Sequence, residues 1–172
     1  ETVLLLDEPF SALDESLRKD LRSELLRLRT ELQLSIVFVT HDLREAHLLA
    51  ARIAVLDEGH ILQFASREEV FRYLASRRVA ELTGVTNLFE GEMLGDRIVV
   101  AGLPLRVSIP PNPSSMVDVA IRAERCVLRR IDSSSELPEN SYVAYITNAL
   151  AIGNTHTLQL APENQAPLKE IE

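Results

Sequence analysis

The chain has 172 residues and a formal net charge of −8, from 18 basic and 26 acidic side chains. Both halves are acidic, which argues against a general nucleic-acid-binding protein, and hydrophobic residues make up 46%, enough for a folded core. The single cysteine, Cys126, excludes an internal disulfide and fits a reducing compartment. Because no apolar run reaches the roughly 20 residues of a membrane span and no basic leader opens the chain, we expect a soluble, cytosolic protein.

The first predicted elements are a strand, a helix and a second strand. Residues 2–6 form a continuous apolar run, typical of a strand that is covered on both faces of a parallel sheet. Leucines recur every three or four residues from position 15 to 32, which predicts a helix whose basic residues, Arg22 among them, lie on the solvated side. Residues 35–40 are again apolar, so the three elements predict a βαβ unit with parallel strands. The apolar stripe of this helix consists of Leu17, Leu21, Leu25, Leu28 and Leu32.

Further short elements follow in the first half. Residues 43–51 predict a helix, and residues 53–56 and 60–64 predict a hairpin that turns at Gly59. Ser66 and Glu69 have the spacing of a capping box and open the next helix. A last helix over residues 75–82 is expected to stop near Gly84. We therefore place a domain boundary at residue 84.

The second half reads differently, as an all-β segment. Seven of the eight prolines lie after residue 100, and alternating apolar segments are separated by turn-forming clusters. Cys126 stands beside two apolar residues, which favours a small core residue over a nucleophile. The predicted strands cover residues 87–92, 98–101, 103–107, 117–125, 142–150 and 153–160.

The segment VLLLDEP, residues 3–9, carries the strongest chemical signal. An apolar strand that ends in Asp7 and Glu8 delivers two carboxylates to the carboxyl edge of a sheet, where open α/β sheets bind ligands. One carboxylate can then hold Mg²⁺ while the other orients an attacking water. By itself the segment is a weak signal, because a buried strand followed by a charged turn is common and is the more frequent explanation.

Two more segments strengthen the signal. SALD, residues 11–14, follows directly, and VTHD, residues 39–42, ends the next strand. A βαβ unit places the ends of its two strands side by side, so Glu8 and His41 are expected to be neighbours. A histidine there can contact a phosphoryl oxygen. The alternative is a capped strand end with a hydrogen-bonded imidazole of purely structural role.

Together these three segments resemble the Walker B strand, the D-loop and the switch histidine of ATP-binding-cassette (ABC) transporter ATPases. The resemblance implies ATP and Mg²⁺ as cofactors. It implies that Asp7 holds Mg²⁺, that Glu8 is the general base or water-positioning carboxylate, and that His41 contacts the γ-phosphate of ATP. It also implies that Asp14 communicates across a dimer of ATPase subunits.

Three family motifs have no counterpart in the chain: the GxxxxGK[ST] phosphate loop, the LSGG signature and the glutamine loop. In the family all three precede the Walker B strand. We therefore expect residues 1–84 to be the C-terminal part of an α/β, P-loop NTPase-type domain, in a piece of a longer subunit that is inactive alone. A partial sheet leaves an open strand edge, so the isolated chain is expected to self-associate.

Residues 85–172 resemble the accessory β-domain called TOBE, a small OB-like barrel found in importer subunits. The segment IRAE, residues 121–124, matches the family's Ile-Arg-Pro-Glu except for Ala123 in place of proline. The last ten residues lose the alternation, so the module is expected to be cut short. Its later strands resemble the molybdate type more than the sugar type.

The implied function is the ATP-hydrolysing subunit of an ABC importer, which works as a homodimer on the inner face of the cell membrane. Its implied partners are membrane permease subunits and, indirectly, a solute-binding protein, with no nucleic acid. An oxyanion such as molybdate is favoured as solute over sugar, polyamine or ferric iron. Two alternatives remain open: a regulatory, dimerising or solute-sensing β-module, and an ABC-family ATPase without a role in transport.

The remaining candidates carry weaker signals. The charged corner at residues 122–125 fits either a solvated turn or an ion-paired contact with the ATPase part. Three histidines are scattered without metal-ligand spacing and are expected to be structural or on the surface: His47, His60 and His156.

Overall fold

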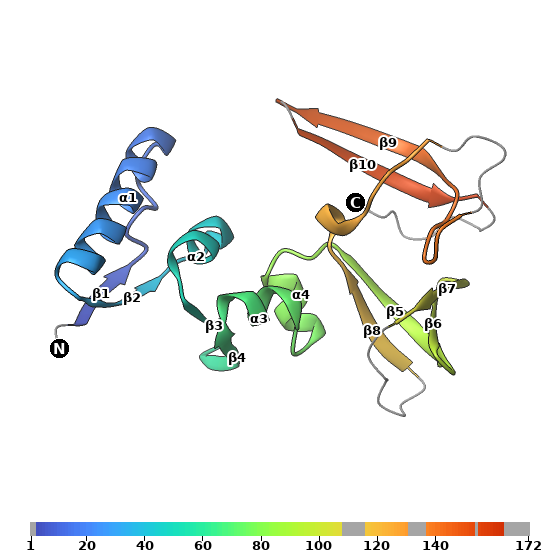
Figure 1. Cartoon of the computed structure of the whole chain (residues 1–172), viewed down its shortest axis with the longest axis horizontal. Helices are drawn as coiled ribbons and strands as arrows, with labels where there is room; N and C mark the ends of the chain where they lie inside the picture. Colours follow the sequence, from blue (N-terminus) through green and yellow to red (C-terminus); the bar gives the residue numbers. More distant parts are fainter. Residues whose placement is uncertain (1–2, 108–115, 131–136, 154, 164–172) are drawn as a thin grey trace. The chain divides into compact units, whose positions relative to one another are not determined.

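The computed structural model describes residues 3–107, 116–130, 137–153 and 155–163. Two compact units divide the chain, residues 1–75 and residues 76–172. The first mixes helices with short sheets, and the second consists mainly of strands (Figure 1). None of the described helices is long and apolar enough to cross a membrane.

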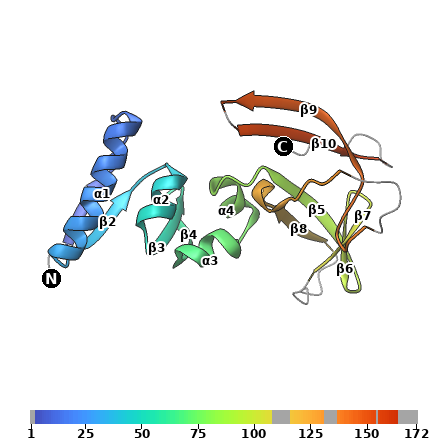
Figure 2. The same ribbon diagram turned by 45° about the horizontal axis from the view of Figure 1, so that its top comes forward.

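The expected strand, helix and strand are present at the start of the first unit. Strand β1 (Val3–Asp7) pairs in parallel with β2 (Ser35–Val39), and helix α1 (Glu15–Glu31) connects them. In both ribbon views α1 runs alongside the strand pair (Figures 1 and 2). The parallel register aligns Asp7 with Val39, so both strands reach their carboxyl ends together.

The expectation that this sheet is covered on both faces is wrong for the described residues. Burial alternates along both strands, and the side chains of Leu5 and Val37, which are register partners, are 72% and 56% exposed. The leucine stripe of α1 is likewise only partly covered, because Leu25 and Leu28 are half-buried while Leu32 is 61% exposed. Two strands and one helix are too few layers to enclose both apolar faces.

The rest of the first unit follows the predicted order. Helix α2 (Leu43–Leu49) leads to the hairpin of β3 (Arg52–Asp57) and β4 (His60–Ser66), whose turn residues Glu58 and Gly59 both have positive φ. Helix α3 (Arg67–Arg72) begins at the predicted capping box, with both reciprocal hydrogen bonds present. The buried apolar residues of this unit are Phe10, Leu49, Val55 and Val70.

The second unit begins with helix α4 (Arg77–Leu82), which ends before Gly84 at φ 76°. Four antiparallel strands then form an open sheet in the order β7-β6-β5-β8, and β9 and β10 form a separate hairpin. A closed OB-like barrel is not seen among the described residues. The bounds are β5 (Asn87–Leu94), β6 (Arg97–Val100), β7 (Leu103–Arg106), β8 (Met116–Ile121), the 3₁₀ turn η1 (Ala123–Arg125), β9 (Ala144–Ile152) and β10 (Thr155–Pro162).

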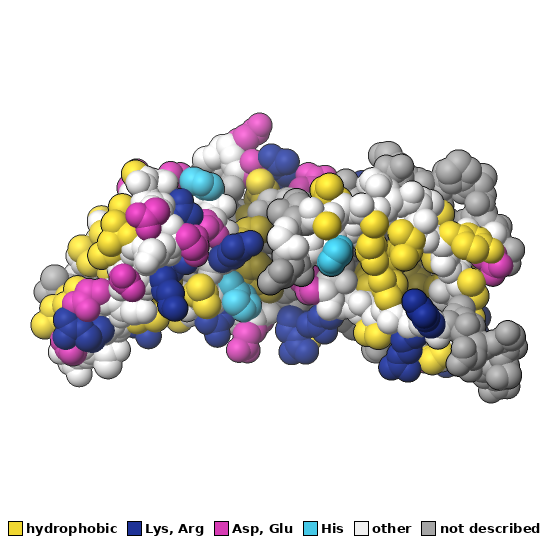
Figure 3. Space-filling model, turned by 90° about the horizontal axis from the view of Figure 1, so that it is seen from above, with side chains coloured by type: hydrophobic (Ala, Val, Ile, Leu, Met, Phe, Trp, Pro, Cys, Tyr) yellow, Lys and Arg dark blue, Asp and Glu magenta, His cyan; other side chains and the backbone are white. Residues whose placement is uncertain are grey.

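Apolar side chains remain exposed on the β9–β10 hairpin. Tyr145, Ile146 and Leu150 of β9 are each more than half exposed. Viewed from above, hydrophobic side chains gather over this hairpin (Figure 3).

Candidate functional site

Glu8 stands where β1 ends, in a backbone conformation that side-chain-bearing residues rarely adopt. Its φ is 42°, in the left-handed region, which costs on the order of 1 kcal/mol for a residue other than glycine. Three hydrogen bonds hold it there: its N–H donates to Val39 O (2.9 Å), and its carbonyl accepts from the N–H (3.2 Å) and the hydroxyl (3.0 Å) of Ser11. The turn after β1 is therefore fixed by the neighbouring strand and by the SALD segment.

His41 meets Glu8 at this edge. Its Nδ1 lies 2.8 Å from Glu8 Oε1, although the two residues are 33 positions apart in the sequence. The expected proximity of the two strand ends is thus confirmed. Both side chains are open to solvent, with 76% of the imidazole and 44% of the carboxylate exposed. Both side chains can therefore be reached by a ligand from the solvent.

The pKa of His41 is raised above its usual value. The largest cause is the hydrogen bond that the imidazole donates to Glu8, followed by the negative charge of that carboxylate; the carboxylates of Asp42 and Glu45 add smaller contributions. A higher pKa favours the imidazolium form of His41, because the adjacent carboxylate attracts its positive charge. The Glu8 carboxylate therefore stabilises the protonated form of His41.

Asp7 and Asp14 lie on either side of Glu8 in the sequence. Asp7 is the last residue of β1 and is exposed. Asp14 is the N-cap of α1, and its Oδ1 accepts a hydrogen bond from Leu17 N at 2.9 Å. Asp14 thus has a defined local role, which is to begin the helix that connects the two strands.

The donor atoms at this edge fit part of a magnesium site. Carboxylate oxygens are ligands that Mg²⁺ prefers, and Asp7 offers one that faces solvent. No group of three or more metal-ligating side chains gathers among the described residues. The described part of the chain therefore supplies a fraction of such a coordination shell.

A buried polar cluster behind the pair was not anticipated from the sequence. Arg22 was expected on the solvated face of α1, but only 11% of its side chain is exposed, and its Nη2 lies 3.1 Å from Oε1 of the buried Glu45. The guanidinium also lies over the ring of Phe10, 5.8 Å from its centroid. The prediction that Arg22 is solvated was wrong. Helical spacing shows which side of α1 a residue lies on, but it does not show that a carboxylate on another helix packs against that side.

Arg18, one turn earlier on α1, holds the SALD segment. Its Nε donates to Leu13 O (2.9 Å), and its Nη2 donates to Ser11 O (3.3 Å). Its Nη1 also lies 3.8 Å from Oδ2 of Asp42, the residue after His41. The repeat of arginines four residues apart on α1, at 18 and 22, is the sequence signal that could have pointed to this cluster.

No protein-family model matches the chain. A sulfate/thiosulfate import ATP-binding protein (CysA) of Photorhabdus laumondii is 44% identical over 120 residues, which are 70% of this chain and 33% of that protein. A spermidine/putrescine import ATP-binding protein (PotA) of Rubrobacter xylanophilus is 36% identical over 154 residues, 84% of this chain and 41% of that protein. Both relatives are named as ATP-binding proteins of import systems.

The chain is a homologue of the ATP-binding subunits of ABC importers. It spans about a third of the length of the sulfate/thiosulfate import proteins that it matches. A solved structure, described as an inward-facing metal-chelate type ABC transporter, gives a TM-score of 0.42 at 20% identity, covering 72% of this chain and 41% of that one.

Several other sequence candidates lie outside the three ABC motif segments of the sequence. The ring of His47 packs edge-on against Phe71, with centroids 5.1 Å apart, and Nδ1 of His60 lies 3.0 Å from Glu58 O. His156 lies in β10. Cys126 was expected in a core but is exposed, because the adjacent Val127 and Leu128 are themselves exposed and enclose nothing.

The charged corner of the second unit makes a hydrogen-bonded contact with the end of α4. Arg122 Nη1 lies 3.3 Å from Thr83 O, and its Nη2 lies 3.4 Å from Thr83 Oγ1. Thr83 is buried, with 4% of its surface exposed. Arg122 therefore joins the end of β8 to the C-cap of α4 within this unit.

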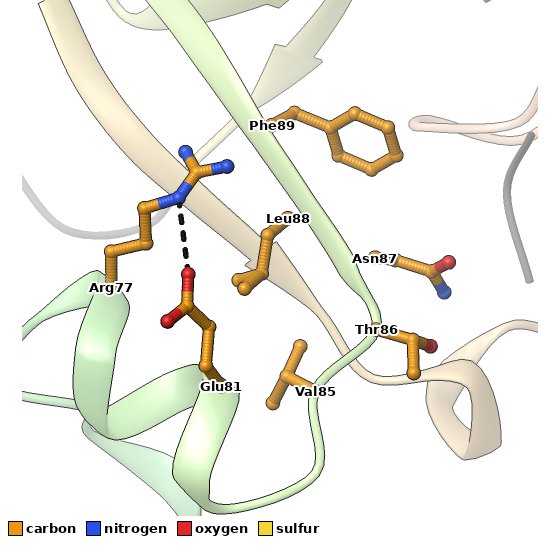
Figure 4. A pocket seen from close by; sticks show the side chains of 7 residues that line it. All are labelled: Arg77, Glu81, Val85, Thr86, Asn87, Leu88 and Phe89. Atoms are coloured by element: carbon orange, nitrogen blue, oxygen red, sulfur yellow. Dashed lines mark ion pairs between the residues drawn. The ribbon is translucent and has the colours of Figure 1, made fainter. Parts of the chain in front are cut away.

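A small cavity of about 320 Å³ opens beside α4 and the start of β5. Arg77 and Glu81 form an ion pair on its helix side (3.6 Å), and the side chains of Leu88 and Val85 lie next to them, whereas those of Asn87 and Phe89 point to the other side of β5 (Figure 4). Arg77 also binds Asp118 of β8 at 3.0 Å. The charges that line this cavity are thus paired with one another.

Proposed function

We propose that this chain is the part of an ABC importer ATP-binding subunit that carries the hydrolytic carboxylate and the switch histidine. The observation that carries the proposal is the contact of 2.8 Å between Glu8 and His41 at the carboxyl ends of two parallel strands. Ligands of open α/β sheets bind at that edge. The proposed reaction is hydrolysis of the γ-phosphate of ATP by water.

Glu8 and His41 divide the work in this proposal. Glu8 orients the attacking water and accepts its proton, which requires a carboxylate held in place before the reaction. Three hydrogen bonds to the backbone N–H and carbonyl of Glu8, one of them from the Ser11 hydroxyl, hold the residue in that position. His41, whose pKa is raised by Glu8, offers a cation to an oxygen of the γ-phosphate. The pair thus places a base and a positive charge beside one reaction centre.

Asp7 and Asp14 have supporting roles in the proposal. Asp7 would hold Mg²⁺, directly or through water, and the metal would neutralise charge on the phosphates of ATP. Asp14 would communicate with a second ATPase subunit from the start of α1. The phosphate loop and the signature sequence would come from the remainder of a longer subunit, so that the chain alone is inactive. Residues 85–172 would be a TOBE-like β-domain, expected to form an OB-like barrel.

The partners and the solute are inferred from the relatives. The subunit would form a homodimer that works with membrane permease subunits at the cytoplasmic face of the membrane, and a solute-binding protein would deliver the solute. An oxyanion is the favoured solute class, since the names of several relatives specify sulfate and thiosulfate. A polyamine is the second candidate, favoured by the spermidine/putrescine relatives. Molybdate, which the later strands suggest, belongs to the oxyanion class.

The variant His41→Ala in the full-length subunit tests the assignment. We expect ATP hydrolysis to fall by about 10² or more while the thermal melt is nearly unchanged, because the imidazole is exposed and makes one hydrogen bond. Val70→Asp is the matched folding control, since Val70 is completely buried and a charge there lowers stability by several kcal/mol. If His41→Ala melted as early as Val70→Asp, a purely structural histidine would be the better account.

A further inference from the structure

Glu45 is a buried carboxylate in the first turn of α2. It is 3% exposed, and each of its oxygens has its own donor from a different element. Arg22 Nη2, on α1, donates to Oε1 at 3.1 Å, and the hydroxyl of Thr40, at the end of β2, donates to Oε2 at 2.6 Å. The carboxylate therefore ties a helix and a strand end to the start of α2.

Both neighbours of His41 depend on this arrangement. Thr40 Oγ1 donates to Glu45 and at the same time accepts from the N–H of Asp42 at 3.0 Å. Asp42 in turn caps α2 by accepting from Arg44 N (2.8 Å) and Glu45 N (3.4 Å). The backbone on either side of His41 is thus held by side-chain hydrogen bonds that lead to Glu45.

The imidazole itself has little other support. Its side chain is 76% exposed, and within the described residues its hydrogen bond is the one to Glu8. An exposed side chain with one hydrogen bond takes its position mainly from its backbone. The turn at residues 40–42 therefore sets how far the ring lies from Glu8.

Arg22 extends the same cluster to the Glu8 side. Its guanidinium lies over Phe10, which is 3% exposed and stands two residues after Glu8. Its Nε is buried without a hydrogen-bond partner, so the contact with Glu45 is the main compensation for its charge inside the unit. A second contact, Nη1 to Glu15 at 3.5 Å, reaches a largely exposed carboxylate.

We propose that Glu45 is a positioning residue for the hydrolytic pair: with Thr40 and Arg22 it fixes the turn that presents His41 to Glu8. The role of Glu45 in catalysis rests on the proposed function. Its role in placing His41 beside Glu8 does not depend on that function. A buried ion pair adds little net stability compared with apolar residues of the same size, whereas it does select one arrangement of the groups around it. Here the selected arrangement is the relative position of two turns, the one after β1 that carries Glu8 and the one after β2 that carries His41.

The test uses an isosteric pair of substitutions at Thr40. Thr40→Val keeps the shape but removes the hydroxyl that both donates to Glu45 and accepts from Asp42, whereas Thr40→Ser keeps the hydroxyl. The readout is the ¹⁵N chemical shift of His41 Nδ1 in the chain at one fixed pH, with Glu8→Ala defining the shift of an imidazole without the contact. We expect Thr40→Val to move the shift most of the way to the Glu8→Ala value and Thr40→Ser to restore it.

Glu45→Gln gives a second, independent variant. A glutamine has one oxygen and can accept from either Arg22 or Thr40 but not from both, so we expect an intermediate shift of the His41 signal. Arg27→Ala is the control, because Arg27 lies on α1 like Arg22 but pairs with Glu24 and Glu31 on the exposed face. Nδ1 shifts that stay at the unsubstituted value in both Thr40→Val and Glu45→Gln would overturn the inference.

A kinetic measurement separates this inference from the proposed function. In the full-length subunit, Thr40→Val should lower kcat for ATP on the order of tenfold to a hundredfold with little change in KM, and Thr40→Ser should recover it. If the unsubstituted subunit did not hydrolyse ATP, the proposed function would fail while the NMR result would still decide the positioning role. If hydrolysis were normal in Thr40→Val, the positioning role would fail and the proposed function would stand.

Discussion

At the scale of single residues, the molecule concentrates strain and charge at the end of β1. Glu8 adopts φ 42°, and its Oε1 lies 2.8 Å from Nδ1 of the exposed His41. One residue thus combines an uncommon backbone conformation with a hydrogen bond to a distant segment. Such conformations persist only where the surroundings determine them. The hydrogen bonds from Ser11 and to Val39 provide those surroundings.

The raised pKa of His41 gives a pH dependence with a definite sign. Because the folded pKa lies above the unfolded value of roughly 6.5, the Glu8–His41 pair contributes its stability fully below that unfolded value and loses it as pH rises through the folded pKa. Glu8→Ala removes the largest cause and should lower the pKa of His41. An NMR titration of the His41 imidazole in the unsubstituted chain and in Glu8→Ala measures this pKa difference directly.

The control for this titration is Glu58→Ala, which removes an exposed carboxylate from the β3–β4 turn. The pKa of His41 should then stay at its unsubstituted value. An equal pKa of His41 in the unsubstituted chain and in Glu8→Ala would show that the contact between them does not exist in solution.

At the scale of secondary-structure elements, α1 and α2 are joined by buried charges rather than by apolar packing alone. Arg22 and Glu45 have 11% and 4% of their side chains exposed. Removing one partner leaves the other charge buried and uncompensated. We expect Glu45→Ala to lower the free energy of unfolding by about 3 kcal/mol in urea denaturation.

The double variant Arg22→Met/Glu45→Leu shows whether an uncompensated charge or lost packing causes the loss of stability in Glu45→Ala. It removes both charges and keeps the volume, so most of the lost stability should return. If the double variant were as unstable as the sum of its two single changes, packing around the aliphatic stems rather than the charge would be responsible.

Strand β5 depends on a close approach at Gly91. A Cβ at that position would lie 2.4 Å from Ile98 Cγ2 on β6 and 3.0 Å from Val119 Cγ2 on β8. Gly91→Ala should therefore destabilise the second unit by about 1–3 kcal/mol. Urea denaturation measures the loss, and adding Ile98→Ala should recover part of it. A fully stable Gly91→Ala would mean that the three strands lie further apart than described.

The elements were predictable where local pattern decides them. The βαβ order, the Gly59 turn and the capping box at Ser66 each follow from spacing within a few residues. The pairing of Arg22 with Glu45 was not predictable, because a charged residue on a helix is usually solvated and its partner is 23 positions away. Cys126 was misjudged because two apolar neighbours do not make a core unless other elements cover them.

At the scale of the whole molecule, each unit exposes apolar surface. In the first, Leu5 and Val37 are register partners on the uncovered face of the β1–β2 pair. Parallel strands are usually covered on both faces, and this pair was expected to be so. Sequence patterns identify the strands and their carboxyl edge, which contains the candidate site, but they do not show how many further strands complete a sheet.

That exposed face predicts self-association of the isolated chain. We expect sedimentation velocity at micromolar concentration to show dimers or larger species, because the apolar side chains of β1 and β2 face water. Leu5→Lys/Val37→Lys should shift the distribution toward the monomer. An unsubstituted chain that sediments as a single monomeric species would contradict this expectation.

The central claim is that Glu8, beside His41, is the carboxylate that drives hydrolysis of ATP. The most direct measurement is ATP turnover and ATP binding by the full-length subunit with Glu8→Gln, compared with the unsubstituted subunit. The amide keeps the shape but does not accept a proton from water, so turnover should fall by about 10² or more while ATP still binds. Turnover near the unsubstituted rate would contradict the account.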